Sequence, residues 1–223
     1  MKKRNSLATV ALLAAGVFCS SAFAQYEGSI LIRGGVMQVK PKVESGSLSG
    51  PAPSNSTIDN GPSTKIGGGV TLMMTDHISI DLPLAPPFKF PINGTGAIQG
   101  VGKLGTVKSL PATQFVQYRF REPEAAFRPY IGLGITYAYF FDEEGSAAFS
   151  GVTNPGGTTR FKVKSKFALT PQIGATWMFS EPYFVDIWYA KTFLKTTATL
   201  STGQTQNLVL NPRTLQISVG MAL

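Results

Sequence analysis

One stretch of the chain alternates in polarity for far longer than an ordinary strand. Between Phe127 and Asp142 every odd position holds a large apolar residue or a proline, and most even positions hold a small or polar residue. A period of two indicates a β-strand, because successive side chains point to opposite faces. The run is about three times the usual strand length. A strand that crosses a membrane at a tilt, with one face toward lipid, needs this length and this alternation.

The first 24 residues predict a signal peptide. A basic start at positions 2–4 is followed by an apolar run, and Ala22-Phe23-Ala24 is a typical cleavage site. We therefore expect a mature chain that begins at Gln25 and forms one domain over residues 25–223. The one cysteine, Cys19, would leave with the signal, so no disulfide is expected. No later segment approaches the ~20 unbroken apolar residues of a membrane helix.

Alternation recurs in eight segments, which predict an all-β fold. They span residues 29–42, 64–75, 77–85, 105–121, 126–142, 162–179, 183–200 and 208–223. An even number of long antiparallel strands favours an eight-stranded transmembrane β-barrel of the outer-membrane type, because closure leaves no sheet edge exposed to lipid. A soluble periplasmic lipid-binding barrel has similar strands. It would be recovered in aqueous extracts without detergent.

The connections between these segments alternate between short and long. Three are tight turns, whereas residues 43–63, 86–104, 143–161 and 201–207 form longer connections rich in Gly, Ser, Pro and Asn. This is the pattern of periplasmic turns and external loops, and it places both termini in the periplasm of a Gram-negative outer membrane. Most lysines fall in the predicted external half. A cationic rim suits the phosphate-bearing lipopolysaccharide of the outer leaflet.

Phasing each strand by its apolar face predicts which side chains point inward. Charged residues gather near the periplasmic end, and we interpret them as a plug rather than a gate, because opposite charges in so narrow an interior should pair. The predicted charged plug comprises Arg33, Asp81, Arg119, Arg128 and Asp186. Eight strands enclose only enough space for side chains or one small ligand, which excludes a wide aqueous pore.

The sequence predicts no catalytic, cofactor-binding or metal-binding residue. The one histidine, His77, falls at a predicted periplasmic turn, away from the external loops, and the mature chain has no cysteine to bind a metal. The glycines at 67–69 lack the Lys-Ser/Thr of a phosphate loop, so close strand packing explains them better. Nucleic acid is not an expected partner of an exported barrel.

Several segments resemble the OmpW family of small outer-membrane barrels, which includes the AlkL-type alkane-uptake proteins. The motifs are Phe127-Arg128-Pro129-Tyr130-Ile131-Gly132, Phe140-Phe141-Asp142, Leu110-Pro111, Tyr118-Arg119-Phe120, Pro87-Phe88, Trp188-Tyr189 and Arg33-Gly34. The resemblance spans nearly the whole mature chain. It implies an eight-stranded barrel whose narrow hydrophobic interior takes up small apolar molecules and releases them sideways into the membrane. Leu223 departs from the usual terminal Phe or Tyr, and Pro83 replaces a lumenal Leu.

We therefore expect a monomeric channel for passive uptake of small hydrophobic molecules. The predicted solute path comprises Trp188, Phe115, Phe140, Phe184, Pro83, Leu84, Phe88 and Phe90. Trp188 and Phe115 could equally be interior filler, and the apolar residues of 82–92 could simply cap the barrel. The alternative function is a structural or receptor barrel whose external loops bind partners without transport.

Overall fold

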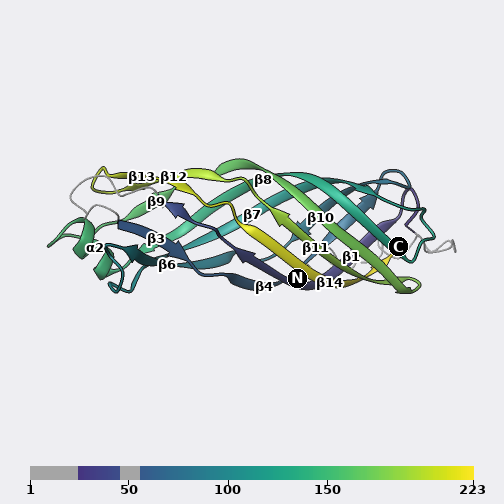
Figure 1. Ribbon diagram of the computed structural model, residues 1–223, viewed down its shortest axis with the longest axis horizontal. Coiled ribbons are helices and arrows are strands. Elements are labelled where there is room, and N and C mark those ends of the chain that lie inside the picture. Colours follow the sequence, from purple (N-terminus) through teal and green to yellow (C-terminus); the bar gives the residue numbers. More distant parts are fainter. Residues whose placement is uncertain (1–24, 46–55) are drawn as a thin grey trace, which may run out of the picture.

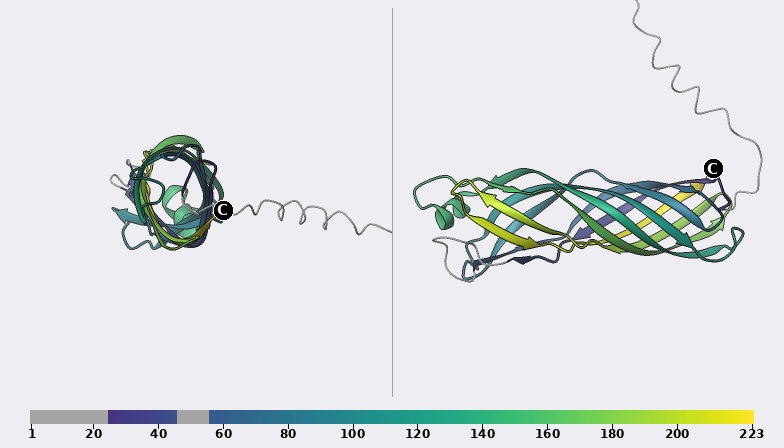
Figure 2. Two further views of the ribbon diagram at one scale, coloured as in Figure 1. Left: turned by 90° about the vertical axis from the view of Figure 1, so that its right-hand side faces the viewer. Right: turned by 90° about the horizontal axis from the view of Figure 1, so that it is seen from above.

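The computed structural model describes residues 25–45 and 56–223, and the predicted signal peptide lies outside this range. Eight antiparallel strands form a closed barrel, as Figures 1 and 2 show. In order around the barrel they are β1 (Ile30–Lys40), β4 (Ser63–Met73), β5 (Ile78–Leu84), β7 (Lys103–Arg119), β8 (Phe127–Gly145), β10 (Lys166–Ser180), β11 (Tyr183–Lys191) and β14 (Arg213–Ala222). Each predicted segment overlaps one of them, with ends that differ by a few residues, and the predicted fold class is confirmed.

Pairing of the first and last strands closes the cylinder. β1 pairs with β14 from Leu31 opposite Ala222 to Lys40 opposite Arg213, and its other edge pairs with β4. On that edge Gly34 and Gly35 face Gly68 and Gly67. A Cβ atom at Gly68 would lie 2.3 Å from the Arg33 carbonyl oxygen, so a side chain at this position would collide with the backbone of β1.

The two ends of the barrel differ. β1 begins and β14 ends at the same end, which also carries the short turns, and we call it the turn end (Figure 2). Beyond the opposite end, the loop end, further elements continue the wall (Figure 1). They are β2 (Glu44–Ser45), β3 (Ser56–Asn60), β6 (Phe88–Gly96), β9 (Phe161–Val163), β12 (Lys195–Leu200), β13 (Thr205–Val209) and the short helix α2 (Ala147–Thr153).

The prediction that residues 86–104 form a loop was wrong. β6 occupies much of this segment and pairs with β7, from Phe88 opposite Ser109 to Asn93 opposite Lys103, and with β3. Strand pairing satisfies the backbone hydrogen-bonding groups of β6. The sequence did not indicate a strand here, because prolines stand at positions 86, 87 and 91 and proline is unusual inside a strand. The predicted loop 143–161 likewise contains α2, which begins at its N-cap Ser146.

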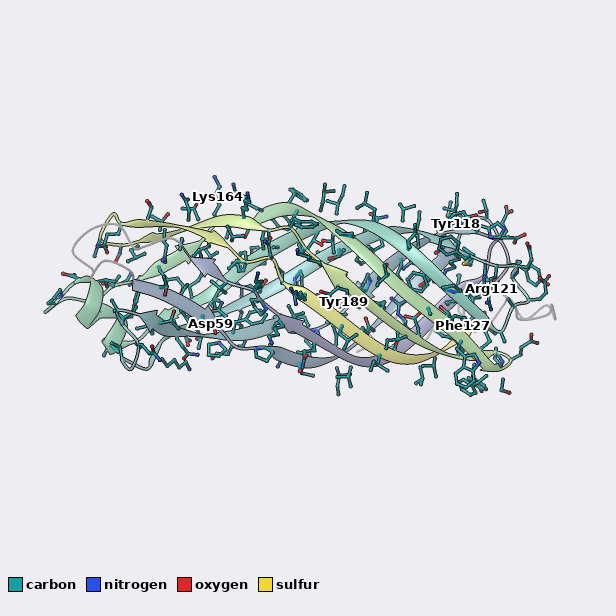
Figure 3. The ribbon with its side chains drawn as sticks, in the orientation of Figure 1. Asp59, Tyr118, Arg121, Phe127, Lys164 and Tyr189 are labelled. Atoms are coloured by element: carbon teal, nitrogen blue, oxygen red, sulfur yellow. The ribbon has the colours of Figure 1, made fainter. Side chains whose placement is uncertain are left out.

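The outer surface is an apolar band between two groups of exposed aromatic residues. Near the turn end these are Tyr118, Phe120, Phe127, Trp177, Phe179 and Tyr183, and toward the loop end Tyr137, Tyr139, Phe167, Tyr189 and Phe193. Figure 3 shows Tyr118 and Phe127 near one end, Tyr189 closer to the middle, and Lys164 and Asp59 further toward the loop end. Aliphatic side chains cover the surface between the two groups. Such girdles mark the two interfaces of a lipid bilayer.

The interior is divided into three layers along the barrel axis. A small apolar cluster of Leu31, Met73, Phe184 and Ala222 lies at the turn end, and a much larger apolar cluster fills the rest of the barrel toward the loop end. Buried polar and charged side chains separate the two. Within the described ranges, no helix has the length and apolar character needed to span a membrane.

Candidate functional site

The buried polar layer is centred on one ion pair. The Arg33 guanidinium donates to both carboxylate oxygens of Asp81, Nη1 to Oδ1 at 2.8 Å and Nη2 to Oδ2 at 2.9 Å. Thr71 donates to Asp81 Oδ1 at 2.7 Å. A Cβ atom at Gly69 would lie 2.8 Å from Arg33 Nη2, so glycine leaves the space that the guanidinium occupies. A paired and hydrogen-bonded charge avoids the cost of burial that a single charge would incur.

Asp186 joins this pair from the far side of the barrel. Its Oδ1 lies 3.6 Å from Arg33 Nε, and its carboxylate accepts from Tyr130 Oη at 3.1–3.2 Å and from Thr176 Oγ1 at 2.9 Å. Strands β1, β5, β8, β10 and β11 therefore all contribute to one network. Tyr130 was not among the predicted plug residues, although its even position in the opening stretch of alternation places it on the inward face.

Arg119 and Arg128 differ from the predicted pairing of opposite charges, because neither forms a salt bridge with any residue of the described ranges. Arg119 donates to Ser79, Gln117, Thr176 and Gln25 at 2.9–3.1 Å and lies 4.7 Å from the centre of the Tyr130 ring. Neutral oxygens and an aromatic face satisfy this guanidinium in place of a carboxylate.

Arg128 closes the turn end by binding backbone carbonyl groups. It donates to the carbonyl oxygens of Gln25, Asp76 and Arg121. Gln25 is fully buried and also binds Arg119. The next residue, Tyr26, donates its hydroxyl to Glu124 Oε1 at 2.6 Å, which holds the pKa of Glu124 below its usual range. Sequence reasoning did not identify Gln25, because its contacts come from residues about a hundred positions away.

An apolar cavity lies on the loop side of this layer. Its volume is about 90 Å³, and its lining includes six residues of the predicted solute path: Pro83, Phe88, Phe90, Phe115, Phe140 and Trp188. Phe115 and Trp188 line the cavity on the side of the polar layer and meet edge to face, with ring centroids 6.0 Å apart. A Cβ atom at Gly134 would lie 2.5 Å from Phe115 Cδ1, so the ring fills the space above that glycine.

The two remaining residues of the predicted path lie elsewhere. Leu84 is 52% exposed on the outer surface, because it shares the outward face of β5 with Leu82. The inward face changes from odd to even positions across the Pro86-Pro87 break, so Phe88 and Phe90 point inward although Leu84 does not. Phe184 is buried, but it belongs to the turn-end cluster on the other side of the polar layer. Neither residue lines the cavity.

A second apolar cavity adjoins the first nearer the loop end. It has a volume of about 50 Å³ and shares Ile58, Ile92, Val163 and Leu208 with the first cavity. Phe149 and Thr153 of α2 line it, and Phe149 packs edge to face on Phe161. Both cavities are therefore lined mostly by apolar side chains, from α2 down to Trp188 and Phe115.

One wall of the first cavity carries a row of hydroxyl groups. Thr113, Thr136, Thr170 and Thr192 are joined by hydrogen bonds of 2.8, 2.6 and 3.0 Å in that order. All four line the cavity. Because these hydroxyl groups bond to one another, the wall remains compatible with an apolar occupant.

The barrel wall beside the cavity contains a gap in strand pairing. β5 pairs with β7 only between Ile78–Asp81 and Phe115–Tyr118, and β6 resumes the pairing at Phe88 and Ser109. Residues 110–114 of β7 therefore have no ladder partner on this side. Pro83, Pro86, Pro87 and Pro111 lie within the interruption, and proline has no N–H to donate to a ladder. Pro83, Ala85, Ser109, Pro111 and Thr113 line the cavity at this gap.

The one histidine of the chain lies far from the cavity. His77 lies at the turn end, where its Nδ1 is 3.1 Å from the Arg119 carbonyl oxygen and its ring stacks on Tyr118. In the part of the chain that the structure describes, no three His, Cys, Asp or Glu residues are grouped to hold a metal ion.

A closed eight-stranded barrel with a lipid-facing band, aromatic girdles and a sealed turn end defines a small outer-membrane β-barrel protein. Residues 26–223 match the OmpW family, and the chain belongs to that family. Outer membrane protein W of Vibrio cholerae is 31% identical to it over 97% of this chain and 98% of its own length. Outer membrane protein W of Escherichia coli is 32% identical over 95% and 97%.

The fold is also found in a solved structure. The crystal structure of the outer membrane protein OprG from Pseudomonas aeruginosa superimposes with a TM-score of 0.81 at 24% identity, covering 91% of this chain and 99% of that one. The family and the outer-membrane location predicted from the sequence are thus confirmed. Since outer-membrane barrels have short periplasmic turns and longer external loops, we assign the turn end to the periplasm and the loop end to the exterior.

Proposed function

We propose that this protein gives small hydrophobic molecules a passive route across the outer leaflet of the outer membrane. The observation that carries the proposal is the position of the apolar cavity, which lies directly inside the unpaired part of the wall between β5 and β7. A solute would enter from the loop end, pass the second cavity and reach Trp188 and Phe115. It would then leave sideways into lipid through the gap.

The polar layer supports a sideways exit over an axial one. Arg33, Asp81 and Asp186 fill the barrel below the cavity, together with Arg119 and Arg128 at the turn end. An apolar solute gains nothing from this layer, and its passage would break buried ion pairs at a cost of several kcal/mol. Exit through the gap, in contrast, would lead into the hydrocarbon of the membrane and would break no hydrogen bonds between β5 and β7.

Cavity size limits the class of solute. A volume of about 90 Å³ is smaller than the ~150 Å³ apolar cavity that binds benzene in an engineered lysozyme. A slim alkyl chain or a small terpene would therefore pass a few carbon atoms at a time. We also propose that the barrel works as a monomer without catalytic activity, and that outer-leaflet lipopolysaccharide contacts its cationic rim.

Uptake of a labelled alkane into liposomes tests the route. Trp188→Glu places a charge in the apolar cavity and should reduce protein-dependent uptake to the level of protein-free liposomes. An unpaired carboxylate is costly to bury, so it would keep its water of hydration in the cavity and block the path of an apolar solute. Trp188→Phe, the matched control, keeps an apolar ring there and should retain most of the uptake.

Equal uptake by the wild type and by Trp188→Glu would contradict this route. If the wild type itself did not exceed protein-free liposomes, the receptor function would be favoured. That function predicts that deletions in the external loops abolish binding of a partner while solute uptake stays at background.

A further inference from the structure

Three cations lie side by side on the outer surface of adjacent strands. Arg213 of β14 is directly opposite Lys191 of β11 on one side and Lys40 of β1 on the other. We call Lys191, Arg213 and Lys40 the cation row. Strand alternation places each on the outward face, since Tyr189 and Leu215, two positions away on β11 and β14, are lipid-facing.

Among the side chains that the structure describes, no acid forms an ion pair with this row. On the opposite wall Lys108 pairs with Asp142 at 2.7 Å and Lys89 lies 3.9 Å from Glu144. Among residues 25–43 and 57–223, no carboxylate lies within 4.0 Å of a cation of the row. Lys191 Nζ does lie 4.8 Å from the centre of the Phe193 ring. Like charges placed directly opposite one another are unfavourable in a sheet, so an anion from outside the chain would stabilise the row.

The position of the row indicates the source of that anion. One step toward the periplasm, the same three strands carry Tyr189, Leu215 and Gln38, and the step below them carries Ile187, Ile217 and Val36. The row thus stands at the external border of the lipid-facing band, beside the aromatic residues Tyr189 and Phe193. At this depth the outer leaflet presents the phosphate groups of its glycolipid.

We propose that the cation row binds one phosphate group of lipid A, with the acyl chains lying along Leu215 and Ile217 below it. Arg213 at the centre can form a bidentate bond to phosphate. Lys191 and Lys40 stand one strand spacing, roughly 4.8 Å, to either side. Three positive charges match a phosphate monoester, which carries roughly −1.5 to −2 at neutral pH. The proposal is independent of solute transport.

Native mass spectrometry of the detergent-solubilised protein, titrated with lipid A, tests the site. The variant Lys40→Gln/Arg213→Gln/Lys191→Gln should bind bisphosphorylated lipid A at least about tenfold more weakly than the wild type, equivalent to losing one strong charged contact. The control Lys89→Gln/Lys108→Gln removes two cations from the opposite wall and should bind like the wild type. Dephosphorylated lipid A should bind the wild type as weakly as the triple variant binds the phosphorylated form.

Three results would overturn the site. The first is equal loss in the triple variant and the control, which would mean that only net charge matters. The second is equally tight binding of dephosphorylated lipid A by the wild type. The third is displacement of lipid A by inorganic phosphate at equal concentration, which would identify a free-anion site. If the triple variant does not fold, Arg213→Gln alone replaces it, since this exposed side chain has no partner within the described chain, and unchanged binding by that variant also contradicts the proposal.

Discussion

Substitutions in the Arg33–Asp81 pair can measure how much the charged layer contributes to the stability of the barrel. Asp81→Asn keeps the size of the side chain but removes its charge and turns a donor toward the Arg33 guanidinium. Asp81 now accepts three hydrogen bonds, two from Arg33 and one from Thr71, and it is fully buried. Removing one partner of a buried pair costs about 3–5 kcal/mol. Since Asp186 stays 3.6 Å from Arg33 Nε as a second counter-charge, we expect a loss of about 3 kcal/mol, at the low end of that range.

Reversible urea unfolding of the protein in lipid vesicles, followed by tryptophan fluorescence, measures this loss. Arg33→Met should also destabilise the barrel, and the double variant should lose much less than the sum of the two single losses, because the second substitution removes the charge that the first left unpaired. A loss below about 1 kcal/mol for Asp81→Asn, the value of an exposed ion pair, would refute the buried pairing. Additive losses would refute it too.

Two further predictions concern the lipid-facing wall and the periplasmic turns. Leu133 is exposed on β8, six residues from Phe127 of one aromatic girdle and six from Tyr139 of the other, so Leu133→Arg should cost about 2–4 kcal/mol in the same unfolding assay, whereas Tyr139→Arg should cost at most about 1 kcal/mol. Similar losses would contradict the placement of the band. Tyr26→Phe should raise the pKa of Glu124 toward its ordinary value, as measured by NMR titration, because it removes the hydrogen bond that lowers it. With a folded pKa below the unfolded one, this bond contributes at neutral pH and is lost as the pH falls through the folded pKa. An unchanged pKa would exclude the bond.

Segment 82–92 shows where sequence reasoning reached its limit. The outward phase of Leu82 and Leu84 follows directly from alternation along β5. The inward phase of Phe88 and Phe90 depends on pairing of β6 with β7, which no local pattern shows across two consecutive prolines. The prediction therefore placed Leu84 with the phenylalanines on one hydrophobic surface. The structure puts it on the other side of the wall.

The contacts of the charged layer were also predicted only in part. Narrowness of an eight-stranded barrel, together with inward phasing, was enough to predict that Arg33, Asp81 and Asp186 would meet. It was not enough to predict that Arg119 and Arg128 would be satisfied by Gln25, by hydroxyl groups and by backbone carbonyls. Those partners depend on how the chain after the predicted cleavage site folds under the turn end.

The sequence by itself determined the barrel, its lipid-facing surface and its family. Each of these depends on local period-two alternation, on the lengths of connections or on motifs, and all of these are properties of neighbouring residues. Only the tertiary structure decided the two cavities, the gap between β5 and β7 and the cation row. These features arise from the register between strands that are distant in the chain, and register fixes which side chains share a layer and where a ladder is interrupted.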